Sequence, residues 1–206
     1  MIKLLGRQTS GNVQKVIFML EEIGKPYERE DYGRQFNNTQ TPEYKALNPT
    51  SKVPTLVDGK TVIWESNSIL RYLAAAYAPA LTGATPAERT EVERWMDWLL
   101  AAVNPAYLTA FKDSKKPANE RAPDYDSQIK ELLAQMAILD AHLKGKSFAA
   151  LEKLTIADIA LAPIMKRCLD FPLERPAFAE LDRWIKAIGE RAAFQIAIGA
   201  KEKKAA

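Results

Sequence analysis

Residues 51–72 read SKVPTLVDGKTVIWESNSILRY, and this stretch decides the fold of the first part of the chain. The runs 55–57 and 61–64 are rich in β-branched and apolar residues, and the Asp-Gly dipeptide between them is a strong hairpin signal. The polar cluster 65–68 then precedes apolar residues at helical spacing. The stretch therefore predicts two antiparallel strands followed by a helix.

The chain before this hairpin alternates strand and helix signals. Residues 2–5 are a short apolar run typical of a buried strand, and residues 27–31 predict a second strand. Between them, apolar residues recur at helical spacing from Val13 to Leu20. The order is strand, loop, helix and strand, and the loop brings polar side chains to the start of the helix.

Residues 79–86 contain two prolines and a glycine and predict a linker. Beyond them the pattern is helical throughout: we expect a long helix that bends at Pro105, a second one over 129–143, and two shorter ones near the end of the chain. The expected organisation is an α/β domain over 1–78, the linker, and an all-helical domain over 87–206.

Composition limits the function. The chain has 206 residues, 47% hydrophobic and 27% charged, with a net charge of +3, so no basic face for nucleic acid is indicated. Cys168 is the only cysteine and His142 the only histidine, which leaves no disulfide and no metal site to predict. No apolar run approaches the ~20 residues that span a bilayer. We expect a soluble cytoplasmic protein without metal.

Three polar side chains, Thr9, Ser10 and Asn12, surround the start of the first helix. Residues of these types favour the N-cap position, where a side-chain oxygen accepts a hydrogen bond from a backbone N–H of the first turn. Helix capping is therefore the simplest interpretation of this group when it is considered alone.

Two pairs of residues on either side of the hairpin suggest more than a fold. Val53-Pro54 before the first strand and Glu65-Ser66 at the start of the next helix resemble the glutathione-binding half of the cytosolic glutathione transferases. The resemblance implies a thioredoxin-like first domain and covers nearly the whole chain. It also implies that Pro54 is cis, that the Val53 backbone pairs with the cysteinyl unit of glutathione, and that the Glu-Ser pair holds the γ-glutamyl end.

The resemblance gives the first loop a catalytic meaning. Serine-type members, among them the theta- and nu-like bacterial proteins, place an activating hydroxyl three residues before the first apolar anchor of the helix, and Ser10 has this spacing to Val13. Asn12 matches an amide that some bacterial subgroups use beside the hydroxyl, and Thr9 is the reserve candidate.

Further ligand contacts are also implied by the resemblance. Lys52 is placed for the glycyl carboxylate of glutathione. Many relatives take one more contact from the irregular segment that follows the second strand, where Thr39 and Gln40 are the candidates.

The stretch Leu154-Thr155-Ile156-Ala157-Asp158 carries an acidic side chain that is easily mistaken for a catalytic one. Thr155 at the N-cap and Asp158 three residues later form the acidic variant of a capping box. The transferase family has the same cap motif in its sixth helix, where it is important for folding. We therefore expect Asp158 to stabilise the fold.

The leading hypothesis is a transferase that activates the thiolate of glutathione with Ser10 for attack on a small hydrophobic electrophile, as in detoxification. One alternative is a glutathione-dependent disulfide oxidoreductase that needs no protein cysteine, and another is a non-catalytic ligand-binding protein. An isomerase of the maleylacetoacetate type fits less well, because its loop carries a Ser-Ser-Cys pattern that is missing here. Homodimerisation is implied by the resemblance alone.

Overall fold

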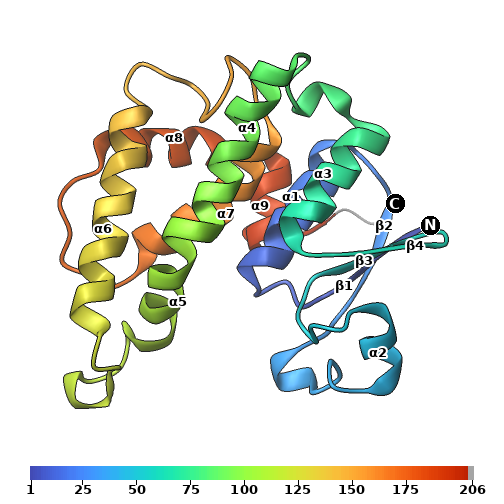
Figure 1. The fold of residues 1–206 in the computed structure, drawn as a ribbon, viewed down its shortest axis with the longest axis horizontal. Coiled ribbons are helices and arrows are strands. Elements are labelled where there is room, and N and C mark those ends of the chain that lie inside the picture. Colours follow the sequence, from blue (N-terminus) through green and yellow to red (C-terminus); the bar gives the residue numbers. More distant parts are fainter. Residues whose placement is uncertain (204–206) are drawn as a thin grey trace. The chain divides into compact units, whose positions relative to one another are not determined.

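The computed structural model describes residues 1–203 and divides into two compact units. Among the described residues, the first unit comprises Met1–Leu81 together with residues 189–203, and the second comprises Thr82–Ile188. A mixed sheet with helices and a separate helical region are the architecture that the sequence predicts (Figure 1). The two units are described one at a time.

The first unit is built on a four-stranded sheet. Its strands are β1 (Ile2–Leu5), β2 (Tyr27–Glu30), β3 (Thr55–Asp58) and β4 (Thr61–Trp64), in the spatial order β2-β1-β3-β4. β1 and β2 are parallel, whereas β3 is antiparallel to both of its neighbours. The predicted hairpin is confirmed, and Gly59 in its turn has a φ of 60°, which glycine adopts without steric cost.

Helices cover both faces of this sheet. In Figure 1, α1 (Gly11–Glu22) and α3 (Ser66–Tyr77) lie on one face, and α2 (Pro42–Leu47) lies on the other. The apolar positions of α1 that recur at helical spacing are all buried: Val13, Val16, Ile17 and Leu20. They supply the core of the unit, as the 3.6-residue period predicts.

The C-terminal helix α9 (Ala192–Ile198) packs against α1. The rings of Phe18 and Phe194 meet edge to face with centroids 5.3 Å apart, and Arg191 donates two hydrogen bonds to the Glu22 carboxylate. Our expected domain boundaries stay a prediction. By packing, however, this last helix belongs to the first unit, whereas the sequence grouped it with the other helices of the second domain.

The second unit is entirely helical among its described residues. Its main elements are α4 (Pro86–Trp98), η3 (Leu99–Val103), α5 (Asn104–Asp113), α6 (Tyr125–His142), α7 (Ile156–Asp170) and α8 (Ala179–Gly189). Its short 3-10 turn is η4 (Ala118–Glu120), and the described part of the first unit has two such turns, η1 (Arg34–Phe36) and η2 (Pro79–Leu81).

The long helix expected to bend at Pro105 is instead interrupted by a turn of π-helix. α4 and α5 are joined through η3, which has π geometry, and Pro105 lies in the first turn of α5. Proline is tolerated there because its missing N–H has no intrahelical partner in the first turn. The irregularity therefore begins six residues earlier than the proline.

The start of α7 carries the predicted cap. The Asp158 carboxylate accepts the backbone N–H of Thr155 at 3.0 Å and its hydroxyl at 3.1 Å. It also accepts the Ala149 N–H at 2.7 Å and the indole N–H of Trp184 at 3.3 Å. Asp158 is fully buried, so these four donors replace the water that a carboxylate would otherwise bind.

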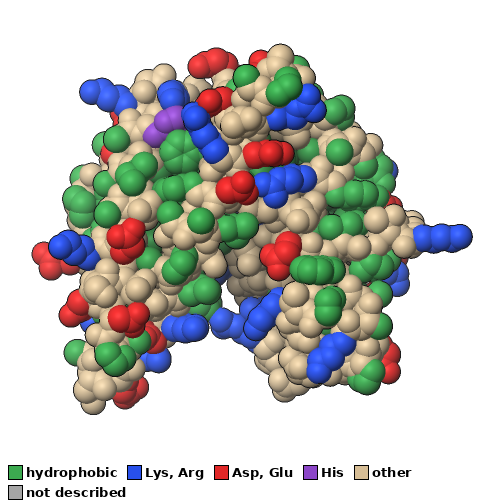
Figure 2. Space-filling model, in the orientation of Figure 1, with side chains coloured by type: hydrophobic (Ala, Val, Ile, Leu, Met, Phe, Trp, Pro, Cys, Tyr) green, Lys and Arg blue, Asp and Glu red, His purple; other side chains and the backbone are tan. Residues whose placement is uncertain are grey.

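Charges of both signs share the surface. Figure 2 shows Lys and Arg side chains interspersed with Asp and Glu on the face that it displays, with hydrophobic side chains between them. Among residues 1–203, no helix is both long enough and apolar enough to cross a membrane.

Candidate active site

The register of the sheet brings the predicted site segments to one edge. Leu5, the last residue of β1, pairs with Thr55, the first residue of β3, and Thr55 pairs with Trp64, the last residue of β4. The loop after β1, the turn before β3 and the start of α3 therefore leave the sheet side by side. These three junctions hold the main residues that the sequence singled out for glutathione: Ser10, Asn12, Lys52, Val53, Pro54, Glu65 and Ser66.

Ser10 is the N-cap residue of α1, but its side chain does not cap the helix. Its backbone is extended, with φ −84° and ψ 124°, and its C=O accepts the first helical hydrogen bond from Gln14 at 2.9 Å. Within residues 1–203 the Ser10 hydroxyl makes no hydrogen bond. The simple capping interpretation is therefore wrong for this side chain, and the hydroxyl remains available to a ligand at a helix N-terminus.

A direct contact joins two of the three segments. The Ser66 hydroxyl donates to Oδ1 of Asn12 at 3.3 Å, which links the first turn of α1 to the first turn of α3. The next residue back, Glu65, is exposed and has a φ of 66°, a conformation that non-glycine residues seldom adopt. Such backbone strain is concentrated at functional sites, where surrounding contacts maintain it.

Val53 lies against the loop that follows β1. A Cβ placed on Gly6 would come within 3.4 Å of the Val53 Cβ, and one placed on Gly33 would come within 3.4 Å of Val53 Cγ1. The peptide bond between Val53 and Pro54 is cis, as the resemblance implied. Lys52, just before them, extends an exposed side chain.

Three buried polar residues near this turn were missed by sequence reasoning. The Tyr44 hydroxyl and the Asn48 amide both donate to the carbonyl of Lys52, at 2.5 and 2.9 Å, and both contact the Thr55 hydroxyl. An Asn directly after a short helix and before a proline is a turn signal, but nothing in that local pattern shows which carbonyl it will contact.

Lys15 on α1 was also missed, because it interrupts an apolar face and would ordinarily extend into solvent. It is only 1% exposed. Burial lowers the pKa of its ammonium group from 10.5 to about 7, and the nearby negative charge of Glu65 only partly opposes this effect. A buried lysine therefore lies within electrostatic reach of a predicted ligand residue.

The remaining candidates lie at the margin of this group. Thr9 precedes Ser10 and is exposed. Thr39 and Gln40 lie in the turn before α2, and within the described chain neither makes a hydrogen bond to a predicted site residue. Their proposed contact with glutathione stays a prediction.

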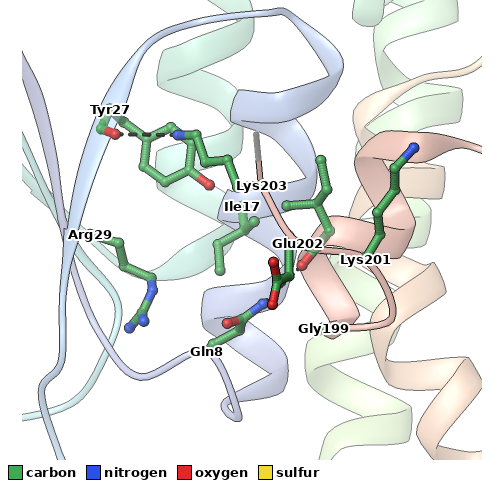
Figure 3. Close-up of a pocket in the computed structure, with 9 residues that line it drawn as sticks. Gln8, Ile17, Tyr27, Arg29, Gly199, Lys201, Glu202 and Lys203 are labelled. Carbon is green, nitrogen blue, oxygen red and sulfur yellow. Dashed lines mark hydrogen bonds between the residues drawn. The ribbon is translucent and has the colours of Figure 1, made fainter. Parts of the chain in front are cut away.

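A hollow of about 460 Å³ lies elsewhere in the first unit, between β2, α1 and the C-terminal segment (Figure 3). Two of its cationic side chains already have partners: Arg29 donates to the Gly6 carbonyl at 3.0 Å, and the Lys203 ammonium lies 3.5 Å from the centre of the Tyr27 ring. None of the predicted site residues lines this hollow.

Two other side chains of reactive types, His142 and Cys168, lie in packed surroundings. His142 hydrogen-bonds the Ala149 carbonyl through Nε2 at 2.7 Å, and its ring lies 4.4 Å from that of Trp95. Cys168 is fully buried, which raises the pKa of its thiol to about 12, so it is a small core residue and not a reactive thiol. Among residues 1–203, no three His, Cys, Asp or Glu side chains are grouped to hold a metal ion.

A thioredoxin-like unit with open polar groups at one sheet edge, followed by a helical unit, matches known proteins along most of the chain. The family model for the glutathione S-transferase N-terminal domain matches residues 9–76, and the model for the C-terminal domain matches residues 96–192. Glutathione S-transferase GstB of Escherichia coli is 36% identical over 198 residues, which cover 94% of this chain and 95% of that protein. The chain therefore belongs to the glutathione S-transferase family of enzymes.

Solved structures with glutathione bound have the same fold. The theta class glutathione S-transferase from Xanthomonas axonopodis pv. citri gives a TM-score of 0.90 at 36% identity, covering 96% of each chain. A family member from Pseudomonas fluorescens pf-5, solved with two glutathione bound, gives 0.84 at 26% identity and covers 96% of this chain and 92% of that one.

Proposed function

We propose that this protein transfers glutathione to a small hydrophobic electrophile and that the Ser10 hydroxyl activates the thiol. The observation that carries the proposal is the Ser10 side chain: it sits at the N-terminus of α1 and makes no hydrogen bond within residues 1–203. A hydroxyl in that position can donate to a thiolate without giving up an existing contact.

The energies involved are sufficient. A cysteine thiol ionises near pH ~8.5, and lowering its pKa by about two units requires ~2.7 kcal/mol of preferential thiolate stabilisation. A hydrogen bond to a charged group supplies ~1.5–3 kcal/mol, and a helix N-terminus adds ~0.3–1 kcal/mol. One hydroxyl at the start of α1 is therefore sufficient to lower the pKa of the thiol by about two units, and the proton can leave to solvent.

The neighbouring residues suit the rest of the tripeptide. The backbone N–H groups at the N-terminus of α3, that of Ser66 among them, provide donors for the γ-glutamyl carboxylate, and Glu65 provides a negative charge for the α-ammonium group. Lys52 is available to the glycyl carboxylate, and the Val53 backbone to the cysteinyl unit. Asn12 supports this arrangement through its hydrogen bond with Ser66.

The test is the ultraviolet thiolate absorbance of enzyme-bound glutathione as a function of pH, in the wild type and in Ser10→Ala. We expect the bound thiol of the wild type to ionise about two pH units below the free thiol and the variant to lose most of that shift. An unchanged shift in Ser10→Ala would assign the activation to Asn12, Thr9 or the helix terminus instead.

A second candidate is the reduction of disulfides with two glutathione molecules. The observation that favours it is the structurally similar Pseudomonas fluorescens protein, which holds two glutathione. The buried Cys168 offers no exposed protein thiol for a dithiol route, so glutathione itself would have to supply both thiols. Turnover of a glutathione mixed disulfide faster than conjugation of any aryl halide or epoxide would favour this reaction.

We further infer that the protein acts in the cytoplasm, because a reducing compartment keeps glutathione in the thiol form. We also infer that it is a homodimer, for which the resemblance to the transferase family is the support. Sedimentation velocity tests the assembly, and a monomer at micromolar concentration would contradict it. Binding of glutathione with no shift of its thiol pKa would replace the transferase proposal with a ligand-binding role.

A further inference from the structure

A closed set of hydrogen bonds surrounds the turn before β3. Tyr44 on α2 and Asn48 directly after it are 2% and 1% exposed, and Thr55 at the start of β3 is fully buried. Tyr44 and Asn48 both donate to the Lys52 carbonyl, and both contact the Thr55 hydroxyl, at 2.9 and 3.0 Å. One side chain from α2 and one from the residue after it thus hold the Lys52 carbonyl and the Thr55 hydroxyl together.

The direction of each bond follows from the number of available protons. The Tyr44 hydroxyl has one proton, and the carbonyl can only accept, so that proton goes to Lys52 and the Thr55 hydroxyl must donate to Tyr44. Burial raises the pKa of Tyr44, so its hydroxyl stays protonated.

The orientation of the Asn48 amide is also determined. Its Oδ1 accepts the backbone N–H of Thr50 at 3.0 Å and the Thr50 hydroxyl at 2.7 Å, so Nδ2 must face the other way. Its two protons go to Lys52 and Thr55. Every polar group in this ring of hydrogen bonds, which joins Tyr44, Asn48, the Lys52 carbonyl and Thr55, is then satisfied. This is the condition under which a buried network rigidifies its surroundings.

The ring fixes both sides of Val53. Lys52 precedes Val53 and has both lone pairs of its carbonyl occupied, while Thr55 follows two residues later and pairs with β1 and β4. Within residues 1–203, the N–H and C=O of Val53 itself make no hydrogen bond. A free donor and a free acceptor on one residue, held between two fixed neighbours, are suited to pairing with a peptide backbone.

We propose that Tyr44 and Asn48 are positioning residues for glutathione: by holding the Lys52 carbonyl and Thr55, they keep the Val53 N–H and C=O oriented for the cysteinyl unit of the ligand. This inference rests on the proposed function. It assigns the orientation of the Val53 backbone to Tyr44 and Asn48, whereas the ionisation of the thiol is assigned to Ser10.

The test compares two tyrosine variants from one stacked pair. Tyr44→Phe removes the hydroxyl that donates to the Lys52 carbonyl and retains the aromatic ring. Tyr32→Phe is the matched control, because the Tyr32 ring stacks on Tyr44 with centroids 5.0 Å apart, and its hydroxyl makes no hydrogen bond in the described chain. Glutathione affinity is measured by calorimetry, and turnover is measured with a chlorodinitrobenzene acceptor.

We expect Tyr44→Phe to raise the Kd and the KM for glutathione by about 3- to 10-fold, the loss of one buried hydrogen bond. The kcat at saturating glutathione and the pKa of the bound thiol should stay at the wild-type values, because Ser10 is untouched. Tyr32→Phe should leave all four quantities unchanged. Thr55→Val, which preserves the β-branched shape, should weaken binding less, since both donors to Lys52 remain.

Two results would overturn the inference while the proposed function stands: wild-type affinity in Tyr44→Phe, or equal weakening in Tyr32→Phe. A wild type that does not bind glutathione would overturn both. The ¹³C chemical shift of the Lys52 carbonyl in the ligand-free protein tests the ring of hydrogen bonds directly. It should move upfield in Tyr44→Phe and not in Tyr32→Phe, and an unmoved signal in Tyr44→Phe would also refute the inference.

Discussion

The helices α1 and α7 start with the same kind of residue, but its side chain is hydrogen-bonded in one helix and not in the other. Both helices begin with a hydroxyl residue at the N-cap, Ser10 in one and Thr155 in the other. The Thr155 hydroxyl and N–H are both bonded to Asp158, inside a fully buried cluster. The Ser10 hydroxyl makes no hydrogen bond within residues 1–203 and is only partly buried.

This difference separates a residue that stabilises the fold from one that is available for chemistry. A cap whose hydrogen-bonding capacity is satisfied by its own helix lowers the free energy of the native state. A cap residue with an unused donor contributes little stability, but it offers that donor, together with the helix N-terminus, to an anionic ligand. Substitutions at the two helix starts should therefore affect different measurements.

The largest effect is expected at α7. Asp158→Ala removes the acceptor of four hydrogen bonds and leaves the buried N–H groups of Ala149, Thr155 and Trp184 without a partner. Each unsatisfied buried donor costs ~1–3 kcal/mol, so we expect the free energy of unfolding to fall by about 3–5 kcal/mol. Urea titration followed by circular dichroism measures this change.

The control for this variant is its remaining activity. If Asp158 acts only on stability, the folded fraction of Asp158→Ala should conjugate glutathione at the wild-type rate per molecule. A loss of activity in fully folded protein would contradict the structural role of this carboxylate.

The reverse pattern is expected at α1. Ser10→Ala removes no hydrogen bond within the described chain, so its free energy of unfolding should stay within about 0.5 kcal/mol of the wild type. Its kcat/KM near neutral pH should fall by about 10- to 100-fold, which corresponds to a lost charge-assisted hydrogen bond of ~1.5–3 kcal/mol. Steady-state kinetics and urea titration on the same preparation give both values.

A destabilised Ser10→Ala with unchanged kinetics would erase the contrast between the two helices. It would mean that Ser10 caps α1 in solution and that another group activates the thiol. Asn12→Ala serves as the matched variant, because Asn12 accepts from Ser66 and its removal should weaken glutathione binding more than thiol ionisation.

Local signals predicted most of the fold. The Asp-Gly turn and its flanking strands, the amphipathic period of α1 and the cap of α7 each depend on residues close together in sequence, so their geometry follows from short-range rules. The packing of α9 against α1 could not be predicted in this way, because a short apolar helix carries no mark of its partner. The π turn before Pro105 also has no local sequence signature.

The candidate site divides along the same line. Ser10, Glu65 and Ser66 were proposed because their places at helix starts resemble those in the transferase family, and the register of the sheet brings these helix starts to one edge. The ring that joins Tyr44 and Asn48 to Thr55 links residues 7 to 11 positions apart through side chains, and no periodic pattern encodes such contacts. Polar residues inside the fold are therefore what sequence reasoning missed.

The smallest effect is expected at Lys15, a buried residue of α1 whose positive charge destabilises the folded state. Its pKa is about 7 in the folded protein against 10.5 ordinarily, so between these values the unfolded chain binds more protons than the folded one. The free energy of unfolding should therefore rise with pH above 7, by at most ~1.36 kcal/mol per pH unit. Below pH 7 the lysine is protonated in both states, and this contribution to the pH dependence disappears.

The measurement is a series of urea titrations between pH 7 and 8.5, a window chosen to lie below the ordinary pKa of 9.0 of the Cys168 thiol, so that most of this thiol stays protonated in the unfolded chain. The wild type should gain about 1–2 kcal/mol over this range, and Lys15→Met, which has an unbranched, uncharged side chain one atom shorter, should gain none. A slope that persists in Lys15→Met would assign the proton to another group. A wild type without this slope would contradict the lowered pKa of Lys15, and α1 would then differ from α7 only in its unused cap.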